Sequence, residues 1–133
     1  MTASARAIPT CVLVVDDEPT VHELLRRALR ANGFMSVHAR TTADAIAVAQ
    51  QQDLQAVVLD LGLGTADTGL NFLVWLRVQP WYVDLPVVIL TGRASVGKDE
   101  QDLIRRHRAH VLHKPQPMEA MMALLSELVD ARA

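Results

Sequence analysis

The sequence predicts an α/β fold in which a parallel β-sheet is covered by helices on both faces. Five short apolar runs alternate with five helical patterns along the chain, which is the βα order of a parallel sheet. Three of the runs (CVLVV, AVVL and PVVIL) are continuous and rich in Val and Ile, as in strands buried on both faces. A length of 133 residues, half of them apolar, suits one domain.

The five apolar runs are the expected strands. The three continuous runs lack the alternation of a half-exposed strand, whereas the second run, MSVHA, alternates apolar with polar residues and is expected near an edge of the sheet. In chain order the expected strands are Cys11–Val15, Met35–Ala39, Ala56–Leu59, Pro86–Leu90 and Val111–Leu112.

The segments between the strands carry helix signals. In the first of them, apolar residues recur at the three- and four-residue spacing of a helix with one buried face. Pro19 suits its first turn, Gly33 suits the position after its end, and Thr41 or Thr42 can cap the second helix. The expected helices are Pro19–Asn32, Thr42–Gln50, Gly69–Val78, Asp99–Arg108 and Pro117–Ala131.

Composition narrows the class of protein. Residues 1–9 lack the apolar stretch of a signal peptide and are expected to form a flexible tail before a domain at 10–131. No apolar run is long enough to cross a membrane, and the single Cys11 excludes an internal disulfide. A net charge of −2 gives no overall attraction to nucleic acid. We therefore expect a cytoplasmic protein that binds neither membrane nor nucleic acid directly.

Polar residues follow the apolar runs where a site is expected. Asp16 and Asp17 follow the first run, Asp60 the third, Thr91 the fourth and Lys114 the fifth. The carboxyl ends of parallel strands meet at one edge of the sheet, where ligands bind in open α/β sheets. Converging carboxylates require a cation, and Mg²⁺ prefers such oxygen ligands. These residues could hold a phosphoryl group on a carboxylate nucleophile.

Four blocks in this order, VLVVDDEP, VVLDLGLG, VVILTG and VLHKP, resemble the conserved blocks of response-regulator receiver domains. The resemblance covers roughly residues 10–130. It implies a flavodoxin-like fold of five βα units with strand order 2-1-3-4-5. It also implies a role in a two-component phosphorelay.

The resemblance assigns a role to each strand-end residue. Asp60 matches the phosphoacceptor. Asp17 matches the acid that binds Mg²⁺ directly, Asp16 its neighbour that acts through water, and Gly62 the residue whose backbone carbonyl is a metal ligand.

The remaining matched residues concern switching. Thr91 matches the hydroxyl that moves to the phosphoryl group, and Lys114 matches the lysine that pairs with a phosphoryl oxygen. The bond from Lys114 to Pro115 is typically cis in the family. Val111 stands where many receivers carry Tyr or Phe, so the usual aromatic switch is missing.

The loop after Asp60 also departs from the family pattern. Receivers usually have Pro four residues after the acceptor and Gly eight residues after it, but this chain has Gly64 and Thr68, with Gly69 one place later. We expect a loop that is one residue longer, with the acceptor unaffected.

The implied partners are proteins. A histidine kinase or phosphotransfer protein would donate the phosphoryl group, and slow autodephosphorylation would be the only other self-catalysed step. A downstream protein would bind the face formed by the fourth helix, fifth strand and fifth helix. Whether that face also forms a homodimer is left open by the sequence.

Other functions of this architecture fit less well. The acidic DDEP segment would repel the phosphate of FMN, and Gly62 cannot act as the general acid of an aspartyl-phosphate hydrolase. The basic run from Arg105 to Arg108 is expected to be a solvated helix face, since the sequence offers no aromatic platform for nucleic acid. The remaining alternative is a receiver-like interaction module that works without phosphorylation.

Overall fold

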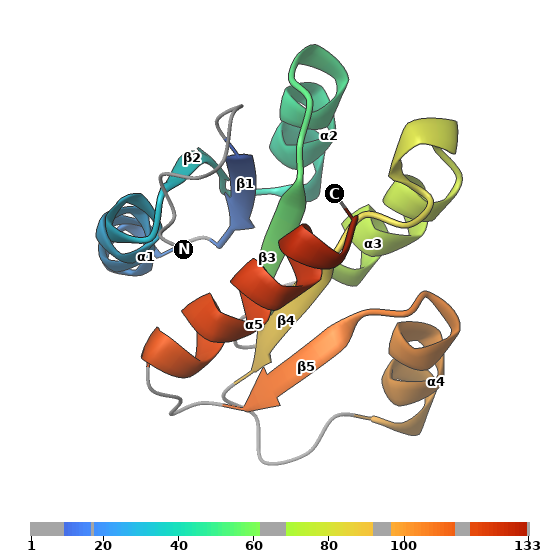
Figure 1. Ribbon diagram of the computed structural model, residues 1–133. Helices are drawn as coiled ribbons and strands as arrows, with labels where there is room; N and C mark the ends of the chain where they lie inside the picture. Colours follow the sequence, from blue (N-terminus) through green and yellow to red (C-terminus); the bar gives the residue numbers. More distant parts are fainter. Residues whose placement is uncertain (1–9, 17, 62–68, 92–96, 114–117, 133) are drawn as a thin grey trace.

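The computed structural model describes residues 10–16, 18–61, 69–91, 97–113 and 118–132 (Figure 1). Strands and helices alternate as expected, with one short 3₁₀ helix added between α3 and β4. The elements are β1 (Thr10–Val15), α1 (Pro19–Ala31), β2 (Phe34–Ala39), α2 (Thr42–Gln51), β3 (Ala56–Leu61), α3 (Gly69–Arg77), η2 (Pro80–Tyr82), β4 (Val87–Thr91), α4 (Lys98–Arg106), β5 (His110–His113) and α5 (Met118–Arg132).

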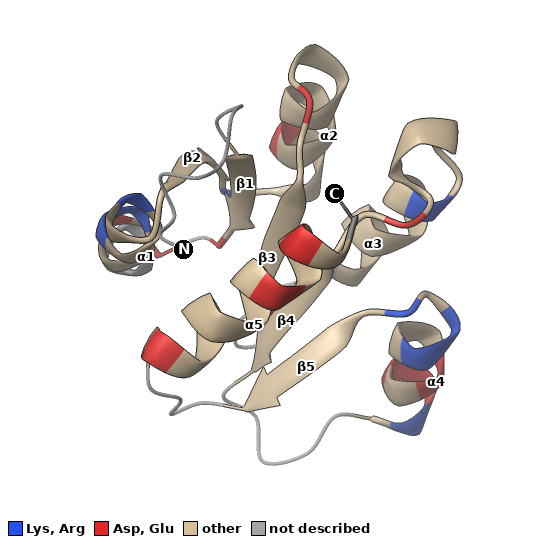
Figure 2. Ribbon diagram, viewed as in Figure 1, with Lys and Arg blue, Asp and Glu red and all other residues tan. Residues whose placement is uncertain are grey.

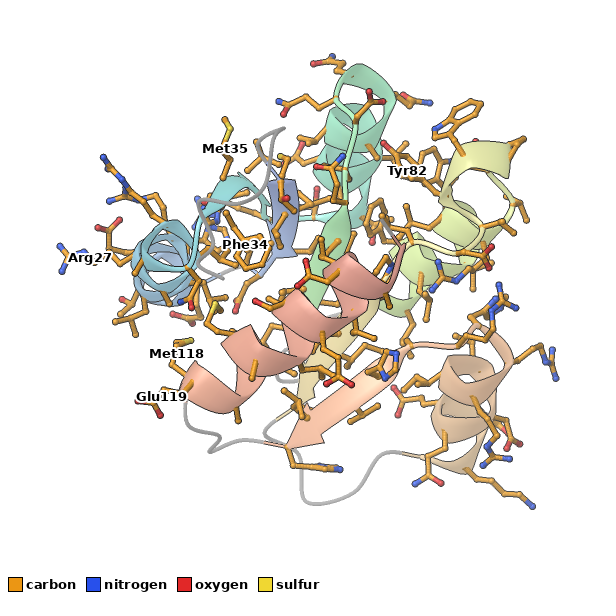
Figure 3. All side chains as sticks on the ribbon, viewed as in Figure 1. Arg27, Phe34, Met35, Tyr82, Met118 and Glu119 are labelled. Atoms are coloured by element: carbon orange, nitrogen blue, oxygen red, sulfur yellow. The ribbon has the colours of Figure 1, made fainter. Side chains whose placement is uncertain are left out.

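The five strands form one parallel sheet in the order β2-β1-β3-β4-β5. This order confirms the flavodoxin-like fold predicted from the sequence. Strand β2 is at an edge, as its alternating pattern predicted, with Phe34 buried and Met35 exposed to solvent (Figure 3). Among the described residues, no helix is both long enough and apolar enough to span a membrane.

Two apolar cores lie on opposite faces of the sheet. Alternate residues of β1 face opposite ways: Leu13 packs with residues of α2, α3 and α4, whereas Val12 and Val14 pack with α1 and α5. Covering both faces explains why the central strands are continuous apolar runs. Each fully buried Leu or Val side chain contributes about 1.5–3 kcal/mol relative to exposure, so these two layers supply much of the stability of the fold.

The predicted helix ends are present. Pro19 opens α1, and Gly33, with a φ of 85°, follows its C-cap Asn32. Only glycine adopts such a backbone conformation without strain, which explains its place here. The hydroxyl of Thr41 accepts a hydrogen bond from the Asp44 backbone N–H at 3.1 Å, so the cap of α2 is Thr41 rather than Thr42.

Most element ends differ from the sequence prediction by one or two residues, and three differences have a clear physical reason. Pro86 precedes β4 instead of starting it; proline has no N–H to donate, although its carbonyl accepts a hydrogen bond from Val57. Helix α4 ends at Arg106, because Arg108 adopts a φ of 57° and turns the chain into β5. The 3₁₀ helix η2 was not predicted at all, since tertiary contacts described below hold it in place.

Candidate functional site

Strand register brings two of the predicted acids to the same level of the sheet. Val15 at the end of β1 pairs with Leu59 of β3, so the following residues, Asp16 and Asp60, come next to each other at the carboxyl edge. The parallel pairing of β1 with β3 therefore places two carboxylates from distant segments at the carboxyl edge of the sheet, as the sequence predicted.

Asp16 connects three elements at this edge. Its side chain is 5% exposed, and its backbone N–H donates to the carbonyl of Ala39 at the end of β2 at 3.0 Å. Its Oδ1 accepts a hydrogen bond from the backbone N–H of Glu18 at 2.8 Å, directly before α1. Glu18 is the N-cap residue of α1, but its own side chain makes no capping hydrogen bond. Asp16 thus fixes the turn from β1 into α1.

Thr91 lies at the same edge, one strand further along. It is fully buried, and in the strand register it is level with Leu61, the residue after Asp60, and with His113 of β5. Asp60 itself is only half-buried, so the described part of this edge combines an accessible carboxylate with a buried hydroxyl. A threonine hydroxyl can donate one hydrogen bond, and such a donor suits an anion.

Val111 lies in β5 opposite Ile89 and is half-buried, packing against the core formed with α2, α3 and α4. A valine in this place has neither the reach nor the hydroxyl of an aromatic switch residue. Its position is that of a packing residue in the strand that leads towards the carboxyl edge.

Several predicted site residues lie outside the described residues. They are Asp17, Gly62, Lys114 and Pro115 at the predicted site, Gly64 and Thr68 in the loop, and residues 1–9 of the predicted tail. Within the described residues, no group of three or more His, Cys, Asp or Glu side chains could hold a metal ion.

The described donors nevertheless fit Mg²⁺. Asp16 is a buried carboxylate held by hydrogen bonds, and Asp60 is a half-buried carboxylate beside it in the register. Oxygen ligands of this kind are the ones that Mg²⁺ binds, usually with water completing its coordination. Asp16 and Asp60 could therefore supply part of a magnesium site.

The structure also brings together two histidines that the sequence did not connect. His22 of α1 and His38 of β2 pack with ring centroids 4.8 Å apart, and the Oγ of Ser36 is 3.1 Å from the Nε2 of His38. Burial, followed in importance by the neighbouring His22, lowers the pKa of His38. The two rings therefore pack against each other, and no spacing signal in the sequence could have paired them.

Comparisons with known proteins agree on the family. The sequence profile described as the response regulator receiver domain matches residues 12–126. The chain is 32% identical over 120 residues to the transcriptional regulatory protein KdpE of Mycobacterium tuberculosis, covering 90% of this chain and 51% of that protein. It is 34% identical over 122 residues to the response regulator MprA of Mycobacterium sp. strain KMS, covering 92% and 51%.

Solved structures share the fold. The chemotaxis response regulator CheY4 of Vibrio cholerae superposes with a TM-score of 0.79 at 24% identity, covering 91% of this chain and 99% of that one. A receiver domain protein from Methanospirillum hungatei gives a TM-score of 0.82 at 18% identity, covering 93% and 96%.

The chain spans about half the length of the curated relatives it matches. The match to the family extends over almost all of the described α/β unit, from β1 into α5. The chain belongs to the response regulator receiver domains, the signalling phosphoacceptor domains of two-component systems.

Proposed function

We propose that Asp60 accepts a phosphoryl group from the phosphohistidine of a histidine kinase or phosphotransfer protein. The observation that supports this most directly is the strand register, which aligns Asp16 with Asp60 and sets the buried Thr91 level with the residue after Asp60. The half-buried position of Asp60 keeps its carboxylate within reach of a partner protein.

The proposed reaction forms one bond and breaks one. A carboxylate oxygen of Asp60 attacks phosphorus, the bond from phosphorus to the imidazole nitrogen of the donor breaks, and the donor leaves as histidine. The product is an aspartyl phosphate, and its later hydrolysis by water restores Asp60. The phosphoryl transfer adds negative charge at the carboxyl edge, and the hydrolysis removes it again by releasing inorganic phosphate. Both steps pass through a transition state with negative charge on the phosphoryl oxygens, so positive charge is needed there.

Receiver domains generally use Mg²⁺, and we assign its ligands in this chain to Asp17, Asp60 and the backbone carbonyl of Gly62, with Asp16 acting through water. When bound, the ion neutralises charge on the carboxylates and on the phosphoryl oxygens. The contribution of Asp16 to this arrangement is its hydrogen bond to Glu18, which orients its carboxylate before any ion binds.

Thr91 and Lys114 are the residues that sense the phosphoryl group in this proposal. A phosphoryl group adds about 1.5–2 negative charges, which a hydroxyl donor and a lysine ammonium would stabilise. Their movement would change the face of α4, β5 and α5, and we assign Val111 and Pro115 to the same switch. That face would then bind a downstream protein. Size-exclusion chromatography of the phosphorylated chain would show whether it also forms a homodimer there.

Intact-protein mass spectrometry after incubation with acetyl phosphate and Mg²⁺ tests the proposal. We expect one labile phosphoryl adduct, absent from the Asp60→Asn variant and from a sample containing a metal chelator. Asp53→Asn is the matched control, because Asp53 is an exposed aspartate before β3, at the opposite end of that strand from Asp60. Its adduct should equal that of the wild type.

Two results would contradict the assignment. An adduct that persists in Asp60→Asn would place the acceptor elsewhere. No adduct from acetyl phosphate, together with no complex with beryllofluoride, would favour an interaction module that works without phosphorylation. Lys114→Ala should keep Mg²⁺ binding but weaken the conformational response to phosphorylation. If the phosphorylated variant has the same spectrum as the phosphorylated wild type, Lys114 does not have that role.

A further inference from the structure

Two histidines meet where α1 packs against the edge strand β2 (Figure 1). His22 lies in the first half of α1, and His38 lies near the end of β2. Their ring centroids are 4.8 Å apart, and the ring planes are inclined to each other by 40°. Neither histidine has a part in the proposed phosphoryl transfer, so the pair requires an explanation of its own.

Each ring has one buried nitrogen without a hydrogen-bond partner. Among the described residues, no group donates to or accepts from the Nε2 of His22 or the Nδ1 of His38, and both atoms are shielded from solvent. Buried polar atoms in folded proteins are nearly always hydrogen-bonded, because an unpaired one keeps the full cost of its desolvation. Two such atoms on adjoining rings indicate a site for a ligand that binds both rings.

The spacing of the rings suits a metal ion that both of them bind. With a bond of about 2.0–2.1 Å from each nitrogen to the ion, two imidazoles on one ion have centroids roughly 4.5–5.5 Å apart, depending on the angle at the metal. The observed separation of 4.8 Å lies within this range. Both rings are therefore within reach of a single ion.

Ser36 prepares His38 for this role. The Oγ of Ser36 is 3.1 Å from the Nε2 of His38 and can accept the proton of that nitrogen, which leaves Nδ1 with a bare lone pair. Histidines that bind metals in proteins usually donate their other N–H to a neighbouring acceptor in this way, which fixes the ring. Burial, followed by the neighbouring His22, lowers the pKa of His38, so protons compete little with a metal ion at neutral pH.

The charged residues of α1 limit the site to two protein ligands. Basic and acidic residues lie together on this helix (Figure 2), and Arg26 and Arg27 hold the carboxylate of Glu23 at 2.7 Å and 3.0 Å. Glu23 is therefore occupied, and because both arginines are exposed, water screens their repulsion of a cation. Since no third His, Cys, Asp or Glu among the described residues completes a metal-binding group, water would fill the other coordination positions.

We propose that His22 and His38 form a binding site for one divalent transition-metal ion of the Ni²⁺, Cu²⁺ and Zn²⁺ group. Imidazole nitrogen suits these ions, whereas Mg²⁺ prefers the oxygen ligands at the carboxyl edge of the sheet. With only two protein ligands the ion binds reversibly. It joins α1 to β2 and stabilises the folded chain according to its concentration.

Titration of the full chain with Zn²⁺, followed by calorimetry in excess Mg²⁺, tests the proposal. The excess Mg²⁺ limits binding of Zn²⁺ to the carboxylates at the carboxyl edge. Burial raises the pKa of the Cys11 thiol, which keeps it protonated and a poor ligand. We expect one Zn²⁺ to bind per chain, and NMR of the histidine rings should identify the Nε2 of His22 and the Nδ1 of His38 as the bound nitrogens.

Variants locate the ion. His22→Gln and His38→Gln each remove a ligand and should weaken Zn²⁺ binding by at least about 10-fold, and Ser36→Ala, which removes only the acceptor that orients His38, should weaken it by about 10-fold. His110→Gln is the matched control, because His110 is an exposed histidine on β5, at the other edge of the sheet. Zn²⁺ should raise the urea midpoint of the wild type and of His110→Gln, but not that of His38→Gln.

Three results would overturn the proposal: no binding of Zn²⁺ in excess Mg²⁺, binding that either His22→Gln or His38→Gln leaves unchanged, or binding that His110→Gln abolishes. Urea unfolding without Zn²⁺ shows whether each variant folds, and if a histidine variant does not, Ser36→Ala decides in its place. Failure here leaves the phosphoacceptor assignment untouched, because that assignment is tested by a phosphoryl adduct formed with Mg²⁺.

Discussion

Substitutions of Asp16 can separate its structural role from its electrostatic role at the carboxyl edge. The Oδ1 of Asp16 accepts a hydrogen bond from the Glu18 backbone N–H at 2.8 Å. Asp16 itself is 5% exposed. Asp16→Asn removes the charge but keeps an oxygen acceptor, whereas Asp16→Ala removes both. The charge effect is common to the two variants, so the difference between them isolates the hydrogen bond.

The size of that difference follows from the geometry. A side-chain acceptor for a backbone N–H at the start of a helix contributes about 0.5–2 kcal/mol, and bonds to buried groups are at the upper end. We expect Asp16→Ala to be less stable than Asp16→Asn by about 1–2 kcal/mol, or roughly 4–7 °C in Tm for a domain of this size. Urea unfolding without Mg²⁺, followed by circular dichroism, measures it.

Adding Mg²⁺ tests the electrostatic role. At a concentration ten times its Kd, the ion should stabilise the wild type by about 1.4 kcal/mol; a tenfold weaker Kd in Asp16→Asn would reduce this to about 0.4 kcal/mol. Equal stability of the Asn and Ala variants would refute the hydrogen-bond argument. Equal stabilisation of the wild type and Asp16→Asn by Mg²⁺ would refute a part for the Asp16 charge in metal binding.

Two further predictions concern groups away from the acids. Tyr82→Phe should lower the free energy of unfolding by about 1–2 kcal/mol, because it removes the single O–H donor that two backbone carbonyls share, whereas the exposed Trp81→Phe should change it by less than about 0.5 kcal/mol in the same urea titration. Burial lowers the pKa of His38, so the folded state resists its protonation and stability should decline as the pH falls below the ordinary histidine pKa of about 6.5. Urea midpoints at pH 7.5 and pH 5 should differ less in His38→Gln than in the wild type; equal differences would assign the pH dependence to other groups.

The sequence by itself predicted the order of the elements and the edge of the sheet at which a site is expected. Continuous Val- and Ile-rich runs favour strands covered on both faces, and Pro19 and Gly33 mark the ends of the first helix through local backbone chemistry. For the second helix the sequence offered Thr41 or Thr42 as the cap, and the structure selects Thr41. Asp16, Asp60 and Thr91 each follow or end an apolar run, so parallel pairing was bound to gather them at one edge.

Tertiary structure alone decided what depends on contacts between distant segments. Helix η2 exists because the Tyr82 hydroxyl reaches carbonyls of α2, and Arg77 joins it to the end of α4; nothing within PWY signals this. The pairing of His22 with His38 depends on how α1 lies against β2, and the hydrogen bond from Arg108 to the Val83 carbonyl depends on the turn at Arg108. Local patterns encode periodicity and helix ends, whereas the partners of polar side chains are chosen only when the chain packs.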